Sequence, residues 1–174
     1  MASILSGINR ESVLDSVRTA LTALAAMLLA RLLKLPEYYW APISSIVIVQ
    51  STIPPRTLGW QRFVGTALGA VLGAALATLF GSTLFSAMFS STAAVYVHVY
   101  GVYGLGLVLC GLVASLLHVA SAYRFAGITL SIVLLISRGG PPWIAAWHRF
   151  LEVSLGIAVA LVVTTVWPLP RKTA

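Results

Sequence analysis

Residues 38–50 read Tyr-Tyr-Trp-Ala-Pro-Ile-Ser-Ser-Ile-Val-Ile-Val-Gln, and beyond a Pro54-Pro55-Arg56 turn the chain continues from residue 60 as Trp-Gln-Arg-Phe-Val-Gly-Thr. Aromatic residues come first, an apolar run follows, and glycines then recur at regular spacing. Tyr and Trp are enriched where a membrane meets water, and small residues allow helices to approach closely in lipid. This stretch therefore predicts helices that pack against one another inside a bilayer.

The composition of the whole chain points to the same surroundings. Of 174 residues, 59% are hydrophobic and 9% are charged, and the mean hydropathy is +0.97. A soluble domain carries about 25% charged residues. The net charge of +7 would suggest nucleic acid for a soluble protein, but here the basic residues lie at the ends of apolar segments. We predict a single integral membrane domain over residues 1–174, with lipid as its surroundings and no nucleic-acid partner.

Hydrophobic segments and proline breaks predict an all-α, polytopic six-helix bundle with helices at about 13–35, 40–53, 58–80, 101–117, 124–138 and 143–167. The second helix is short and rich in polar residues, so it either spans with its flanks or is a broken helix lining a cavity. Residues 82–100 leave three alternatives open: a hairpin arm, an interfacial helix, or an extension of a neighbouring helix. A seventh span there would reverse the orientation of everything after it.

Six spans place both termini on one side of the membrane, and the basic residues favour the cytoplasm for that side. Seven basic residues then face inward: Arg10, Arg18, Arg56, Arg62, Arg124, Arg171 and Lys172. Four face outward: Arg31, Lys34, Arg138 and Arg149. This excess of inward-facing over outward-facing basic residues agrees with the positive-inside rule.

Small residues recur at exact four-residue spacing along the third predicted helix. The positions are Gly65, Gly69, Gly73, Ala77 and Gly81. A ladder of this kind allows another backbone to approach closely. It indicates helix packing and no chemistry, and we considered it a candidate interface for a homo-oligomer.

Two ionisable residues fall within the sixth predicted helix. Arg149 and Glu152 are three residues apart, and Gly156 lies one turn further along the same face. Charges inside a membrane are costly and usually face a cavity or a partner. Three interpretations remain open: a self-neutralising pair, a structural tie to another helix, or a carboxylate whose protonation couples to transport while Arg149 holds an anion.

The other polar candidates are weaker. Arg62 and Arg18 lie near the predicted inner interface, where long basic side chains usually extend to water. Arg124 shares a heptad spacing with Ser131 and Arg138, which would suit either anion guidance or two interfacial anchors. Ser44, Ser45 and Gln50 are the best uncharged candidates, because short polar-studded segments often carry transporter sites.

Catalytic and metal-binding signatures are missing from the sequence. We find no nucleophile elbow, zinc-protease motif, P-loop or Cys-x-x-Cys pair, and the three histidines are far apart. The single cysteine, Cys110, lies in an apolar run and is expected to be a buried structural thiol. The sequence predicts no enzyme, no metal and no cofactor.

The same residues resemble the fusaric acid resistance and aromatic acid exporter family of membrane proteins. The resemblance covers most of the chain. It is carried by Arg18-Thr-Ala-Leu, Tyr39-Trp-Ala-Pro-Ile-Ser44 with Gln50, Arg62-Phe-Val-Gly-Thr-Ala-Leu-Gly69, Tyr123-Arg-Phe-Ala-Gly-Ile-Thr129, Arg149-Phe-Leu-Glu-Val-Ser-Leu-Gly156 and Trp167-Pro168.

The resemblance implies a six-helix bundle in the bacterial inner membrane that exports aromatic or other organic acids, often driven by protons. Plant malate channels of the wider group are similar in outline and imply passive anion conduction as an alternative. Many members carry a second six-helix half or a large cytoplasmic domain, whereas this chain ends soon after Trp167. We therefore expect a homo-oligomer.

The sequence thus favours a transporter that exports organic anions, with aromatic carboxylates as the first candidates. Under this hypothesis Arg149 and Glu152 couple anion and proton, Arg62 and Arg124 draw anions to the inner mouth, and Ser44, Ser45 and Gln50 line the path. A passive anion channel with the same residues is the first alternative. A non-transporting membrane subunit that scaffolds a larger export or envelope complex is the second.

Overall fold

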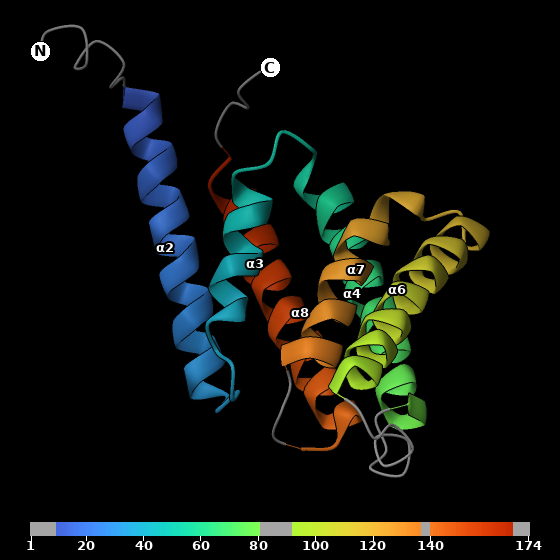
Figure 1. The fold of residues 1–174 in the computed structure, drawn as a ribbon. Coiled ribbons are helices and arrows are strands. Elements are labelled where there is room, and N and C mark those ends of the chain that lie inside the picture. Colours follow the sequence, from blue (N-terminus) through green and yellow to red (C-terminus); the bar gives the residue numbers. More distant parts are fainter. Residues whose placement is uncertain (1–9, 81–91, 137–139, 169–174) are drawn as a thin grey trace, which may run out of the picture. The chain divides into compact units, whose positions relative to one another are not determined.

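The structure is a computed structural model that describes residues 10–80, 92–136 and 140–168 (Figure 1). These residues form helices and no strand. In chain order the elements are α2 (Arg10–Leu32), α3 (Trp40–Val49), α4 (Pro55–Phe80), α6 (Thr92–Leu116), the 3-10 turn η1 (Ala120–Ala122), α7 (Tyr123–Ser131), the π-helical turn η2 (Ile132–Ile136) and α8 (Pro142–Val166). The all-α prediction is confirmed for the described part of the chain.

The helix that begins at Thr92 corrects the predicted start of the fourth helix at about residue 101. Residues 92–100 continue directly into the following segment as one helix, α6. Of the three alternatives for residues 82–100, the extension of a neighbouring helix is therefore confirmed for 92–100. The remainder of that segment lies outside the described residues.

Four helices in the described ranges are long and apolar enough to cross a membrane. They are α2, α4, the Tyr96–Leu116 part of α6, and α8. Two further apolar helices, Trp40–Val49 and Ala120–Ile136, are shorter. Ten residues of α3 rise only about 15 Å, against a hydrocarbon core of roughly 30 Å. The count of six spans and the cytoplasmic position of both termini stay predictions.

Two helices end on a residue in the left-handed conformation that is not glycine. Lys34 (φ 54°) follows α2 and His118 (φ 57°) follows α6. In each case the next residue donates its N–H five residues back, from Leu35 to the Ala30 carbonyl and from Val119 to the Ala114 carbonyl, at 3.0 and 2.9 Å. These bonds satisfy carbonyl groups at the helix ends and turn the chain sharply. The bond from Leu35 therefore starts the turn between α2 and α3 directly after α2 ends.

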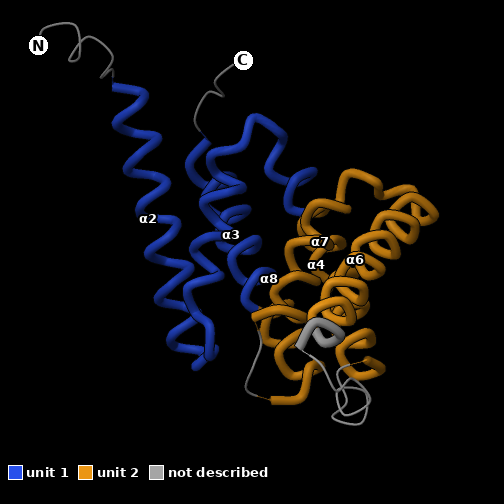
Figure 2. Tube along the Cα trace, in the orientation of Figure 1, with its two compact units in different colours: residues 1–59, 152–174 blue, residues 60–151 orange. Residues whose placement is uncertain are grey.

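The described chain divides into two compact units, residues 1–59 with 152–174 and residues 60–151 (Figure 2). In the first unit, α2, α3 and the later part of α8 pack around a small core of Ala26, Ala30, Ala41 and Val159. Small side chains dominate this core because the backbones lie close together. A Cβ atom added to Gly156 would collide with the Ala41 carbonyl oxygen and lie 2.7 Å from the Cβ of Ser44.

In the second unit the glycine ladder of α4 packs against α7 of the same chain. A Cβ atom on Gly65 or Gly69 would collide with the Ala122 or Ala126 carbonyl oxygen, and one on Gly73 would lie 3.1 Å from Val133 Cβ. The ladder as a homo-oligomer interface is therefore wrong at these three glycines, because an intrachain helix already occupies that face. Ala77 is half-buried, and Gly81 lies outside the described residues.

Candidate functional site

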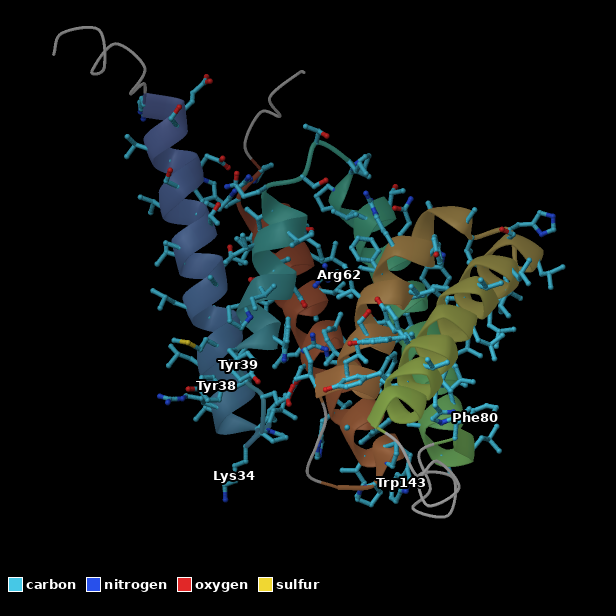
Figure 3. The ribbon with its side chains drawn as sticks, viewed as in Figure 1. Lys34, Tyr38, Tyr39, Arg62, Phe80 and Trp143 are labelled. Carbon is cyan, nitrogen blue, oxygen red and sulfur yellow. The ribbon has the colours of Figure 1, made fainter. Side chains whose placement is uncertain are left out.

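Two arginines meet on one aromatic ring in the unit formed by residues 60–151. Arg62, which is labelled in Figure 3, lies on α4. Its guanidinium carbon is 5.1 Å from the centre of the Phe125 ring. That of Arg124, beside Phe125 on α7, lies 4.8 Å from the same centre. A cation held over a ring is stabilised by about 0.5–2 kcal/mol, more when it is shielded from water. The structure thus brings together Arg62 and Arg124, which are 62 residues apart in the sequence.

The two arginines differ in their exposure. Arg62 is only 8% exposed, whereas Arg124 is exposed. The expectation that Arg62 extends to water is therefore wrong, because its side chain packs on Phe125 between helices that the glycine ladder holds close together. Arg18, for which we had the same expectation, is also 8% exposed.

The charge of this unit is entirely positive. Residues 60–151 contain Arg62, Arg124, Arg138 and Arg149, and every acidic residue of the chain lies outside this range. Arginine is the side chain best suited to hold a carboxylate, because its planar fork offers two parallel N–H donors. A buried and an exposed guanidinium on one ring therefore make this a candidate anion-attracting position among the described residues.

The buried carboxylate of Glu152 belongs to the other unit. Its side chain is 0% exposed, and Oε1 accepts a hydrogen bond of 2.9 Å from the backbone N–H of Glu37. Glu37 lies in the turn between α2 and α3. Arg149, three residues before Glu152 on α8, is 3% exposed. Both ionisable residues predicted within the sixth helix are thus buried.

The hydroxyl groups predicted to line the path are turned toward their own helix. Ser44 and Ser45 are 0% exposed, and they donate hydrogen bonds of 2.9 Å to the carbonyls of Trp40 and Pro42 respectively. Ser44 also packs where α3 meets Gly156. Ser44 therefore serves the contact between α3 and α8.

Under the transport hypothesis of the sequence analysis, we expect Ser45→Ala to change the transport rate by less than about twofold, because its hydroxyl is buried and bonded within its own helix. The measurement is the initial rate in liposomes at matched protein incorporation. Ser16→Ala is the matched control, since that exposed hydroxyl donates to the Ser12 carbonyl in the same way. A tenfold loss for Ser45→Ala alone would instead support the serine as part of the path.

Gln50, the third uncharged candidate, is exposed at the end of α3 and contacts α2. Its amide nitrogen donates to Asp15 Oδ2 at 3.2 Å and to the Thr19 hydroxyl. Asp15 also forms an ion pair of 2.9 Å with Arg18, which donates to the Trp167 carbonyl at 3.4 Å. Sequence analysis missed this polar cluster; the i,i+3 spacing of Asp15 and Arg18 was the signal that could have revealed it.

An apolar groove of about 340 Å³ lies in the second unit, along α4 and the start of α8. No charged side chain lines it, so it offers nothing to the charge of an anion. Its lining residues are alanine, valine and aromatic residues: Ala67, Ala70, Val71, Ala74, Trp143, Ala146, Trp147 and Phe150.

The described residues contain no cluster of three or more potential metal ligands. His98 contacts the Phe80 carbonyl through Nε2 at 3.1 Å, and Cys110 is buried and free, in agreement with a structural thiol. The Tyr103 hydroxyl is 3.0 Å from Ser131 Oγ, and the exposed rings of Tyr96 and Tyr100 stack with their centres 6.0 Å apart.

A family model described as fusaric acid resistance protein-like matches residues 24–163. The chain belongs to this family. No curated protein and no solved structure matches it significantly. Together with the apolar helices, membership in the fusaric acid resistance protein-like family indicates a multi-pass, transporter-like membrane protein.

Some of the polar groups described above lie within the residues matched by the family model, and others lie outside them. Arg62, Arg124, Arg149 and Glu152 lie within the matched residues, as does Gln50. The cluster of Asp15, Arg18 and the Trp167 carbonyl lies outside them. The anion-attracting pair and the buried carboxylate are thus within the part of the chain that this fusaric acid resistance protein-like family defines.

Proposed function

We propose that this protein exports organic anions from the cytoplasm across the bacterial inner membrane, with aromatic carboxylates as the leading substrate class. The observation that carries the proposal is the pair of guanidiniums on the Phe125 ring, in a unit whose sequence has no acidic residue. Membership in a transporter family supports the transport class.

Arg62 and Arg124 have complementary roles in this proposal. The exposed Arg124 attracts an anion from water, and the buried Arg62 holds its carboxylate where fewer water molecules compete. Hydrogen bonds to a charged group contribute about 1.5–3 kcal/mol. The Phe125 ring, itself only 6% exposed, orients both guanidiniums.

Glu152 supplies the coupling to protons in this proposal. It is completely buried in a helix apolar enough to span the membrane, where an ionised carboxylate is costly. Such a group takes up or releases a proton as its surroundings change. Arg149, which precedes it by one helical turn, contributes a positive charge that an arriving anion would neutralise.

The test is reconstitution of the pure protein in liposomes with a labelled hydroxybenzoate. We expect uphill accumulation driven by an imposed pH gradient, and we expect Glu152→Gln to abolish this accumulation while leaving downhill movement in place. A voltage across the liposome membrane is imposed in a separate trial from the pH gradient. Flux that follows only the electrochemical gradient of the anion, unchanged by Glu152→Gln, would identify a passive channel. Absence of flux with several organic acids would contradict both and favour a scaffolding subunit.

A further inference from the structure

The start of α3 rests on one face of α8 with matched spacing. Glu37, Ala41 and Ser44 follow one another at four and three residues, and on α8 Glu152 and Gly156 are four residues apart. The Glu37 N–H bonds Glu152, whereas Ala41 and Ser44 lie against Gly156. The two helices therefore share one contact surface, in which the Glu152 carboxylate is the polar end.

The two ends of this contact are held by different kinds of interaction. The Gly156 end is held by close packing, which does not depend on protonation. The Glu152 end is a hydrogen bond to a backbone donor, and such bonds are roughly twice as strong when the acceptor is ionised. Protonation of Glu152 thus weakens one end of the contact and leaves the other unchanged.

Other charged groups lie in or beside the turn between α2 and α3. Glu37 carries a second carboxylate, whose Oε2 accepts a hydrogen bond of 2.8 Å from the Trp40 indole. Arg31 lies 4.6 Å from the centre of the Tyr38 ring, and Lys34 is exposed at the end of α2 (Figure 3). On α8 itself Arg149 precedes Glu152 by three residues. Glu37 is the residue of this turn whose backbone N–H is seen to bond the Glu152 carboxylate.

We propose that the turn before α3 is held on α8 only while the Glu152 carboxylate is ionised, and that protonation releases this turn at Glu37–Trp40. Glu37 is then a positioning residue, because the strength of its backbone N–H hydrogen bond depends on whether Glu152 is ionised. The proposal rests on the proton coupling proposed above and identifies the element that the proton moves. Release is expected as the pH falls, since the ionised form is the stronger acceptor.

The experiment is amide hydrogen–deuterium exchange of the protein in lipid nanodiscs, without substrate, over peptides that cover residues 37–40. Rates are compared at low and high pH after correction for intrinsic exchange. We expect exchange about tenfold faster at low pH in the unaltered protein, from the loss of a charged hydrogen bond. Glu152→Gln should show the faster rate at both pH values, because its amide oxygen is a neutral acceptor.

Thr164→Val on the same helix is the matched control. The Thr164 hydroxyl donates only to carbonyls of its own helix, at Ala160 and Leu161, as far as the described hydrogen bonds go. This variant should retain the pH response. Equal corrected rates at low and high pH in the unaltered protein would overturn the proposal, even if Glu152→Gln failed to fold.

The exchange experiment separates this proposal from the proposed function. If hydrogen exchange responded to pH but no pH-driven accumulation occurred, the proposal about the contact would stand and the proton-driven exporter would be contradicted. Accumulation that depends on Glu152 without any pH response at residues 37–40 would retain the exporter and overturn the α3 contact.

Discussion

Gly69→Ala should destabilise the protein by at least about 2 kcal/mol and lower the yield of monodisperse material. The new methyl group would collide with the Ala126 carbonyl oxygen and lie 2.9 Å from Thr129 Cβ. Neither neighbour is the end of a flexible side chain, so α7 itself would have to move away from α4. The measurement is thermal unfolding of the purified protein in detergent.

Gly104→Ala on α6 is the control for this change, because a Cβ atom there would meet nothing within 4 Å among the described residues. Alanine is favoured over glycine in helices by up to about 1 kcal/mol, so this variant should be as stable as the parent or more so. If Gly69→Ala unfolded at the parent temperature, the close packing of α4 against α7 would be wrong. The displacement of α7 should also move Phe125, and with it the position of both arginines.

Arg62→Gln should reduce export by about 10- to 100-fold, which corresponds to the loss of a charged hydrogen bond to a bound carboxylate. The side chain is 8% exposed and lies over Phe125, so glutamine would fill much of its volume without its charge. Most of this reduction should result from weaker substrate binding, seen as a higher substrate concentration at the half-maximal rate. The measurement is the initial rate of hydroxybenzoate export across a range of concentrations in liposomes.

Arg31→Gln is the matched control for Arg62→Gln. Arg31 also lies over an aromatic ring, that of Tyr38 at 4.6 Å, but it is exposed and outside the unit of residues 60–151. It should change export by less than about twofold, as expected for an exposed cation. Equal losses in the two variants, or an unchanged half-saturation concentration in Arg62→Gln, would contradict anion binding at the Phe125 ring.

Much of the helical pattern could be predicted because it depends on local properties. Proline pairs, apolar runs and interfacial aromatics predicted α4 and α8 to within three residues at each end. The start of α6 was missed by nine residues, because Gly101, Gly104 and the serines that precede Thr92 weakened the local signal for a helix that begins at Thr92. The spacing of Gly65, Gly69 and Gly73 predicted close packing but carried no information about the partner.

The sequence by itself determined that lipid surrounds the protein, that its fold is all-α and which family it belongs to. It also determined that residues 60–151 contain no acidic residue. These follow from composition and from the period of short motifs, which any fold of the chain would keep. Only the tertiary structure decided that the glycine ladder meets α7, that Arg62 and Arg124 share the Phe125 ring, and that Glu152 bonds the N–H of Glu37. Such contacts join residues up to 115 positions apart. They depend on which helices become neighbours, and helix faces built from the same small apolar residues do not encode that choice locally.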